Sequence, residues 1–163
     1  MKLYVGCGPQ KLKGYMHLDI VSYPHVDFQC PAQKIPVSNG YFDEIYSRHL
    51  VEHFYPWEAK DAIREWYRVL KDDGVVKMVL PDLEFSARQL LQGGMSQRLP
   101  TKTNYEHAMA GLYGWVSEAK PFMAHHWGYT RKTLSDLVEP YFKEVYFMDC
   151  QQGDLSIEAR GKL

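Results

Sequence analysis

The stretch KLYVGCGPQKLKGYMHLDI, residues 2–20, decides the fold class of this chain. The apolar run KLYVG leads into the glycine turn Gly6-Cys7-Gly8, and the second apolar run, MHLDI, carries Asp19 near its end. This pattern predicts two strands, the first followed by a glycine turn and the second by a carboxylate. A glycine turn lets the backbone approach a ligand, and a carboxylate at that position can accept both hydroxyls of a ribose. The stretch therefore indicates a site for a nucleoside-containing cofactor.

The same stretch disfavours a dinucleotide cofactor. The dinucleotide motif G-x-G-x-x-G requires a third glycine, and Lys11 stands there in GCGPQK. Only ten residues separate Gly8 from Asp19, and they include most of the second strand. They leave no room for a full helix whose N-terminus would bind a pyrophosphate.

The remaining chain alternates between predicted strands and predicted helices. We expect further strands at 26–30, 42–47, 75–81, 143–149 and 155–160, and helices at 57–71, 84–92 and 131–139. The last two strands are close enough to be antiparallel neighbours. The alternation predicts an α/β fold, a Rossmann-like and mostly parallel sheet with helices on both faces. Ligands of such sheets collect beyond the carboxyl ends of the strands, where Gly6-Cys7-Gly8, Asp19 and Ser47 would lie.

Proline, glycine and capping residues set the predicted helix boundaries. Pro56 stands at the start of the first helix, and Asp72-Asp73-Gly74 is expected to end it. Thr130 is the expected N-cap of the third helix. Residues 95–125 are the least regular part, with one helix near 105–118, and we treat them as an irregular insertion or lid on the substrate side.

Composition narrows the class of protein. The 163 residues fit a single domain over 1–163, and the net charge of −1 gives no electrostatic case for binding nucleic acid or an anionic membrane. Three cysteines cannot pair completely and show no C-x-x-C spacing, which favours a reducing compartment. No apolar run approaches the length of a membrane span. We therefore expect a soluble, cytoplasmic protein.

The stretch SRHLVEHF, residues 47–54, holds His49, Glu52 and His53 in the spacing H-x-x-E-H. This spacing occurs in zinc hydrolases, where two histidines one helical turn apart bind the ion beside a glutamate base. A third ligand would be needed, and the available residues Glu84, Glu106 and Glu118 lie in no recognisable ligand motif. We expect no metal, with Glu52 and His53 fixing the turn by hydrogen bonds, and keep a zinc hydrolase as an alternative.

Five segments in register resemble the class I S-adenosylmethionine-dependent methyltransferases, in particular their small, compact "predicted methyltransferase" branch (methyltransferase type 11-like). They are YVGCGP, HLDI, FDEIYSRHLVEHF, EWYRVLKDDGVVKMVLPD and HHWGYTRKTLSDLVEPYF, and they span about residues 2–160. The resemblance implies a sheet of seven strands with the last one antiparallel. It also implies S-adenosyl-L-methionine as cofactor, S-adenosyl-L-homocysteine as product, and a small-molecule acceptor.

The resemblance further implies a role for each matching residue. In the glycine turn, Gly6, Cys7 and Gly8 would face the methionine part of the cofactor, and at the end of the second strand Asp19 and Ile20 would face the ribose. In the loop after the third strand, Pro31, Ala32 and Gln33 would flank the adenine. At the end of the fourth strand, Ser47 and His49 would border the transferable methyl. The acid that many members carry after the third strand is replaced here by Cys30 or Pro31.

Histidines are the candidate bases, because methyl transfer needs a base only if the acceptor is a protonated hydroxyl or amine. We take His49, His125 and His126 as catalytic candidates, and expect Asp82 to cap a helix. His17 and His25 are read as surface or loop residues without a role. The residues expected to pack, or alternatively to form an aromatic floor for the acceptor, are Tyr105, Tyr113, Trp115 and Tyr129.

The predicted function is transfer of a methyl group to a hydroxyl or amine of a sugar or related metabolite. The first alternative is a cofactor-binding module without catalysis, or a partner subunit of a larger enzyme. A dinucleotide oxidoreductase is the least favoured. We expect a monomer or homodimer, with room for a partner chain over residues 95–125.

Overall fold

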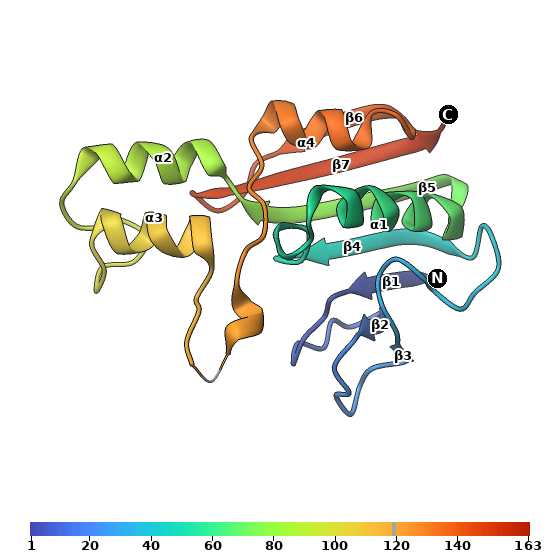
Figure 1. Ribbon diagram of the computed structural model, residues 1–163. Coiled ribbons are helices and arrows are strands. Elements are labelled where there is room, and N and C mark those ends of the chain that lie inside the picture. Colours follow the sequence, from blue (N-terminus) through green and yellow to red (C-terminus); the bar gives the residue numbers. More distant parts are fainter. Residues whose placement is uncertain (119) are drawn as a thin grey trace.

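A computed structural model describes residues 1–118 and 120–163 and contains one seven-stranded sheet, with strand order β3-β2-β1-β4-β5-β7-β6 (Figure 1). β7 runs antiparallel to both β5 and β6, and the other neighbouring pairs are parallel. The strands are β1 (Lys2–Val5), β2 (Met16–Asp19), β3 (Phe28–Gln29), β4 (Phe42–Arg48), β5 (Leu70–Pro81), β6 (Phe142–Met148) and β7 (Asp154–Lys162). The predicted fold class, including the antiparallel last strand, is confirmed.

The helices are α1 (Pro56–Val69), α2 (Leu83–Gln92), α3 (Asn104–Tyr113) and α4 (Arg131–Val138), with the 3₁₀ turns η1 (Val51–His53) and η2 (Pro121–Met123). The strand order reverses between β1 and β4, because the chain first builds outward from β1 through β2 and β3 and then returns to add β4 and β5. The carboxyl ends of β1 and β4 therefore meet at the topological switch point, where sheets of this kind bind ligands.

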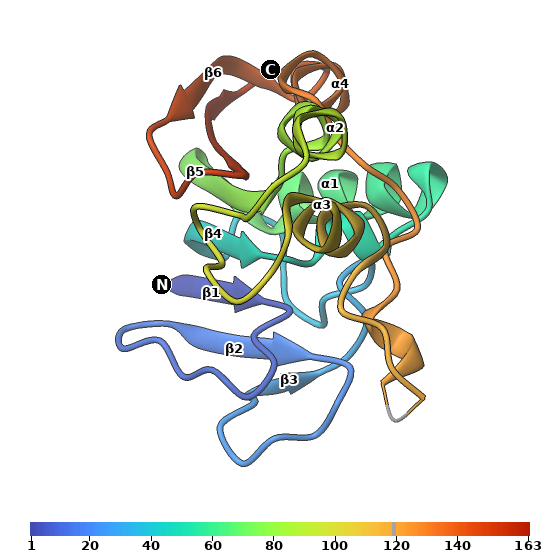
Figure 2. The ribbon, with the colours of Figure 1, turned by 90° about the vertical axis from the view of Figure 1, so that its left-hand side faces the viewer.

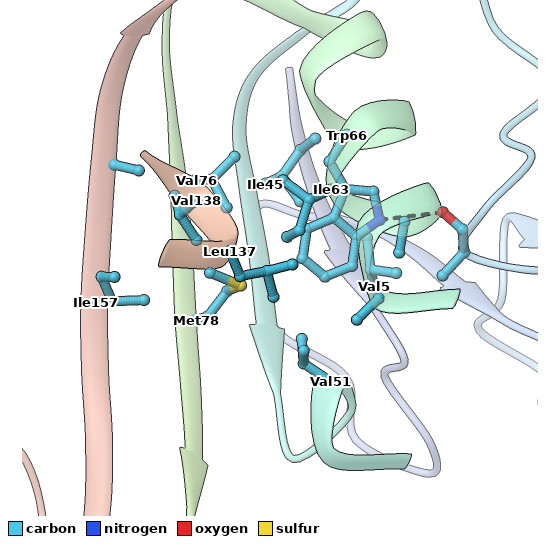
Figure 3. Packing of buried hydrophobic residues seen from close by; sticks show 14 of the residues in the cluster. Val5, Ile45, Val51, Ile63, Trp66, Val76, Met78, Leu137, Val138 and Ile157 are labelled. Atoms are coloured by element: carbon cyan, nitrogen blue, oxygen red, sulfur yellow. Dashed lines mark hydrogen bonds between the residues drawn. The ribbon is translucent and has the colours of Figure 1, made fainter. Parts of the chain in front are cut away.

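One face of the sheet carries the hydrophobic core. α1 and α4 contact each other and pack on the same face (Figure 2). Inward-facing residues of the strands alternate with outward-facing ones, as in Val76, Met78 and Leu80 of β5, each 1 % exposed. Figure 3 shows Val76 and Met78 on the side of the sheet that faces Trp66 of α1, which is fully buried. Burial of these apolar side chains between α1 and the sheet therefore stabilises the fold by roughly several kcal/mol.

The structure differs from the expectation on the opposite face. The connections β1–β2, β2–β3 and β3–β4 contain no helix in the described residues, so helices do not cover that face (Figure 2). The strands adapt by alternation: Glu44 of β4, Lys77 of β5 and Glu158 of β7 point there and form ion pairs, with Lys77 Nζ 2.9 Å from Glu44 and 3.8 Å from Glu158. Because one face of this mostly parallel sheet is polar, its strands alternate between apolar and polar residues and do not form continuous apolar runs.

The end of α1 is a correction. The helix begins at Pro56, one residue before the predicted start, but it ends at Val69, and Asp72-Asp73-Gly74 lies inside β5. Leu70 pairs with Phe42 and Val75 with Glu44, so β5 holds extra residues between two register points, a bulge. Leu70 is fully buried, and a Cβ on Gly74 would meet its Cγ at 2.5 Å. The glycine serves close packing over Leu70 rather than a helix C-cap.

Helix caps agree with the sequence. The Asp82 carboxylate accepts from Glu84 N at 2.8 Å and caps α2, and Thr130 Oγ1 accepts from Thr133 N at 3.2 Å and caps α4. The helix expected near 105–118 is α3, which is shorter and packs against α2 beyond the carboxyl edge of the sheet (Figure 1). Within the described residues, no helix combines the length and apolarity that crossing a membrane requires.

Candidate active site

The glycine turn and the end of β2 are tied together by hydrogen bonds. The Asp19 carboxylate accepts from Gly8 N at 2.8 Å through Oδ2 and from Val21 N at 2.9 Å through Oδ1. Each carboxylate oxygen has a second lone pair, so Asp19 retains acceptor capacity for hydroxyl groups. Ile20 beside it is 69 % exposed. The structure thus brings Gly8, Asp19 and Ile20 to one open edge of the sheet.

The two glycines of the turn face different surroundings, although both have a positive φ. A Cβ on Gly6 (φ 68°) would meet the Leu50 side chain at 2.8 Å, so the turn packs against the residue after His49. A Cβ on Gly8 (φ 55°) would meet nothing within 4 Å. Gly8 therefore has its α-carbon facing open space, which suits the close approach of a ligand.

Cys7 lies inside the turn and is 2 % exposed. Burial, with a smaller contribution from the Asp19 charge, raises the pKa of its thiol to about 11. The side chain fills space within the fold, with Sγ 3.8 Å from His25 Nε2.

The prediction that His17 is a surface or loop residue is wrong: it is 2 % exposed in β2, and its Nε2 accepts from Leu12 N at 2.9 Å.

The three residues of the loop after β3 that were predicted to contact the cofactor lie in different surroundings. Pro31 is exposed, whereas Ala32 is buried and its carbonyl accepts from Trp66 Nε1 at 3.1 Å. Gln33 lines a cavity of about 820 Å³ together with Arg64 and other polar residues of α1. Ala32 and Gln33 are thus held toward α1 and not toward the edge occupied by Asp19.

The H-x-x-E-H stretch leaves β4 as a strand end followed by the 3₁₀ turn η1. Ser47 is buried in β4, and His49 adopts a left-handed conformation (φ 49°) with its backbone N–H donating to Val79 O at 2.8 Å. His49 Nδ1 donates to Glu52 Oε1 at 3.2 Å. Because His49 and His53 do not share one α-helix, the two-histidine helical geometry of a zinc hydrolase is not formed.

Glu52 and His53 hold the chain segment 124–127 in place. The Glu52 carbonyl accepts from His126 N at 2.8 Å and from Trp127 N at 3.1 Å. His53 Nδ1 donates to Ala124 O at 2.9 Å. Glu52 therefore forms hydrogen bonds both within the stretch, to His49, and to a segment distant in the sequence, whereas His53 Nδ1 bonds the distant segment.

This docking separates the two neighbouring histidines predicted as bases. The His125 side chain is 8 % exposed, and its Nε2 lies 4.0 Å from Glu52 Oε1. Burial is the main cause of the lowered pKa of His125, and the Glu52 charge opposes it. His126 is exposed, and its ring stacks on Tyr55 with centroids 4.4 Å apart. Of the pair, only His125 lines the cavity described next.

A cavity of about 350 Å³ lies at the carboxyl ends of β4 and β5, between them and α2 and α3. This volume is at the small end of the range for small-molecule sites. Polar groups and aromatic or apolar side chains both line it. The polar set is His49, His53, Ser86, Arg98, His107, His125 and Asp154, and the rest includes Phe85, Leu99, Trp115 and Met123.

Arg98, His107 and Asp154 are site residues that the sequence analysis missed. Arg98 Nη2 lies 3.3 Å from Asp154 Oδ2, and His49 Nε2 lies 3.8 Å from the same oxygen. His107 Nδ1 shares a hydrogen bond of 2.8 Å with Ser96 Oγ, and burial together with the Arg98 charge lowers its pKa. These residues belong to no local motif, and only the packing of α3 and β7 brings them together.

The predicted aromatic floor is only partly assembled. Trp115 lines the cavity and is 52 % exposed, while Tyr105 and Tyr113 are more exposed still. Tyr129 is a core residue, 4 % exposed. Burial, with a smaller contribution from the Glu52 charge, raises the pKa of Tyr129 to about 12.

Comparisons with known proteins agree with this geometry. Residues 10–78 match a family model described as a methyltransferase domain. No curated protein sequence matches the chain. Among solved structures, a protein from Pyrococcus horikoshii OT3 matches with a TM-score of 0.68 and 16 % identity, over 99 % of this chain and 81 % of that one.

Two further solved structures carry a described activity. A methyltransferase described as SAM-dependent, from Methanosarcina mazei, matches with a TM-score of 0.63 and 16 % identity, over 99 % of this chain and 92 % of that one. The 1,6-didemethyltoxoflavin-N1-methyltransferase of Burkholderia thailandensis, solved with 1,6-didemethyltoxoflavin and S-adenosylhomocysteine, gives 0.62 and 14 %, over 99 % and 70 %. At these identities the neighbours establish the fold, and the family match begins at Gln10, just after the glycine turn, and ends within β5. Together they show that this chain has the class I methyltransferase fold and that residues 10–78 resemble a methyltransferase domain.

Proposed function

We propose that this chain is an S-adenosylmethionine-dependent methyltransferase that acts on a hydroxyl or amine of a small polar acceptor, such as a sugar or related metabolite, bound in the 350 Å³ cavity. The supporting observation is the position of His49. It follows β4 at the switch point, with the glycine turn of β1 on one side and the cavity at β5 on the other. Histidines, an arginine and a carboxylate in the cavity suit an acceptor with several hydrogen-bonding groups.

The residues at the ends of β1 and β2 fit the cofactor. Gly8 offers a backbone that a ligand can approach, and Asp19 offers free lone pairs to the ribose hydroxyls. Ile20 supplies an exposed apolar surface next to them. When bound, S-adenosylmethionine supplies an electrophilic methyl group on a positively charged sulfur.

His49 is the proposed base. In the transfer, a lone pair of the acceptor oxygen or nitrogen forms the bond to the methyl carbon, and the electrons of the broken carbon–sulfur bond remain on sulfur. His49 Nδ1 donates to Glu52, which leaves Nε2 to take the acceptor proton. Most of the rate enhancement then comes from positioning, because the cavity and the cofactor edge meet at this side chain.

Residues 95–125 would close the acceptor side, because α3 and Trp115 line the cavity and come from this segment. We keep the expectation of a monomer or homodimer, with exposed Tyr105 and Tyr113 available to a partner chain. The three cysteines are free thiols, which favours the reducing cytoplasm.

Calorimetric titration of S-adenosylhomocysteine tests the cofactor site. Asp19→Asn is expected to weaken binding at least about tenfold, because it removes a charge-assisted hydrogen bond. Asp61→Asn is the matched control, since Asp61 is exposed on α1 and pairs with Arg64. Equal affinity of Asp19→Asn and wild-type protein would contradict the proposed site.

A panel of sugars and amines with radiolabelled S-adenosylmethionine tests the acceptor class. His49→Asn keeps a residue type that tolerates the left-handed conformation, so the fold is expected to persist. It is expected to keep cofactor affinity and lose about 100-fold or more in transfer rate. Cofactor binding with no transfer to any member of the panel would favour a non-catalytic module instead.

A further inference from the structure

We propose that Glu52, His53 and His125 form a binding site for one divalent transition-metal ion beside the acceptor cavity. One candidate ligand atom from each residue lies within 4.8 Å of the other two. Movements of about 0.7 Å each would bring three such atoms to the usual zinc–ligand distance of about 2.1 Å. The assignment departs from our expectation of no metal, and its ligand set differs from that of the zinc-hydrolase alternative because it uses Glu52 and His125 and not His49.

The protonation pattern of the two histidines prepares them as ligands. His53 Nδ1 lies 2.9 Å from Ala124 O, and His125 Nδ1 lies 3.0 Å from Gly111 O. A carbonyl only accepts, so each Nδ1 carries a proton and each Nε2 keeps a free lone pair. Metal-binding histidines usually donate their other ring N–H to a backbone carbonyl or carboxylate in this way. Both histidines therefore have the tautomer that a metal requires.

Glu52 supplies the negative charge. It is 1 % exposed, and its Oε2 has no hydrogen-bond partner among the described residues. A buried carboxylate oxygen without a partner carries a desolvation penalty. Among the described residues, the basic side chains that approach Glu52 are neutral or titratable histidines and no lysine or arginine, with His49 Nδ1 at 3.2 Å and His125 Nε2 at 4.0 Å from Oε1. A bound cation would neutralise the carboxylate.

The chemistry of the set points to a class of ion. Two imidazoles and one carboxylate are the ligands of catalytic zinc sites and of related sites for other first-row transition metals, which keep one or more positions open. Mg²⁺ and Ca²⁺ prefer all-oxygen sites. The open position would face the cavity, because His53 and His125 both line it.

The location suggests what the ion does, and this step rests on the proposed function. A hydroxyl of the acceptor that binds at the open position would lose its proton more readily, since a bound cation stabilises the alkoxide. The site would thus favour acceptors that carry a hydroxyl group over amines.

Metal binding is measured separately from methyl transfer. Full-length protein is stripped with a chelator, dialysed, and titrated calorimetrically with Zn²⁺, while Co²⁺ titrations are followed by visible absorption of the bound ion. We expect one ion per chain. Glu52→Gln and His125→Gln are each expected to weaken Zn²⁺ binding at least about tenfold. His126→Gln is the matched control, since His126 is exposed and stacks on Tyr55.

Folding and cofactor binding are checked in the same variants by circular dichroism and by titration with S-adenosylhomocysteine. Failure of wild-type protein to bind Zn²⁺ or Co²⁺ would overturn the metal site while leaving the methyltransferase function standing. So would binding that survives His125→Gln in a folded protein, or that His126→Gln weakens as much. Conversely, stoichiometric metal with no cofactor binding would contradict the proposed function and leave the metal site intact.

Discussion

The glycine turn after β1 contains two glycines that are needed for different reasons. For Gly6→Ala we expect a loss of stability of about 2–4 kcal/mol, because the left-handed φ costs about 1–2 kcal/mol and the Cβ would overlap Leu50. Gly8→Ala carries only the backbone cost, but its Cβ would project into the space proposed for the cofactor.

Urea unfolding and S-adenosylhomocysteine titration of both variants check this pair. Gly6→Ala should lower the free energy of unfolding the more, and Gly8→Ala should lower the cofactor affinity the more. The reverse order would show that the turn faces the cofactor through Gly6.

Cys7 should be the least reactive of the three cysteines. Burial raises its pKa to about 11, so at pH 8 roughly one molecule in a thousand carries the reactive thiolate. Cys150 is exposed and should react first with iodoacetamide. Peptide mapping by mass spectrometry at timed intervals measures the order, and labelling of Cys7 as fast as Cys150 would show that the turn opens readily.

At the scale of elements, α1 is joined to the loop after β3 by one buried side chain. Trp66 is fully buried, and its indole N–H donates to Ala32 O at 3.1 Å (Figure 3). Trp66→Phe removes the donor, leaves that carbonyl unpaired and creates a small cavity, so we expect a loss of about 2–4 kcal/mol.

Denaturant unfolding of Trp66→Phe measures this loss. Trp57→Phe on the same helix is the control, because Trp57 is 63 % exposed, and it should change stability by less than about 0.5 kcal/mol. Similar effects of the two substitutions would contradict the assigned packing of α1.

The polar face of the sheet predicts a pH-dependent stability. Burial alone would raise the pKa of Glu44, but hydrogen bonds from Tyr15 and Lys77 outweigh it, and the pKa lies below its usual value. A lowered pKa means that Glu44 stabilises the folded state above the pKa of the unfolded chain and that this contribution is lost as the pH falls through the folded value.

Glu44→Gln should therefore be less stable than wild type by about 1–3 kcal/mol at pH 7. The difference should shrink as the pH falls below about 4.3, the ordinary pKa of a glutamate, and should be lost below the lower pKa of the folded state, where the carboxyl group is protonated in both states. Thermal or urea unfolding at several pH values tests this, with the exposed Asp73→Asn as control. A difference that grows toward low pH would have the wrong sign for this account.

At the scale of the whole molecule, the helices beside the proposed acceptor site bury less apolar surface than the strands that carry the proposed cofactor edge. Within the described residues, α2 buries Ser86 alone, and α3 buries Asn104, His107 and two alanines. Small and polar buried groups contribute little hydrophobic stabilisation compared with the leucine, valine and isoleucine residues of β1, β4 and β5.

Amide hydrogen exchange should therefore be fastest in α2 and α3 and slowest in β4 and β5, with α2 and α3 opening by a subglobal route of lower free energy. Mass spectrometry of exchanged peptides measures this. Equal protection of α3 and β5 would contradict it and would argue against residues 95–125 as a cover that moves over the acceptor.

Local sequence determined most elements because their signals are short-ranged. The run KLYVGCGP folds as β1 and its turn, Pro56 begins α1, and Asp82 and Thr130 cap α2 and α4 as expected. Each outcome depends on backbone preferences and hydrogen bonds within a few residues. For the same reason the fold class was recognisable, since the order of strands and helices leaves few arrangements of the sheet.

The boundary after α1 shows where local signals fail. Asp72-Asp73-Gly74 has the composition of a helix stop, yet β5 begins at Leu70. Burial of Leu70 beside Phe42 stabilises the longer strand, and that contact is visible only once the sheet is formed. The uncovered sheet face has a different origin, because connections too short for a full helix leave it without one, as the ten residues between Gly8 and Asp19 already indicate.

For the proposed site, the sequence by itself determined the glycine turn and the carboxylate of Asp19, which lie within one short stretch of chain. Only the tertiary structure decided the acceptor side. It turned His125 toward Glu52 and His126 away from it, through backbone hydrogen bonds to the Glu52 carbonyl. It also brought Arg98, His107 and Asp154 to one cavity. Residues so far apart in the chain are joined by packing between elements, and the free energy of that packing is not encoded in any local pattern.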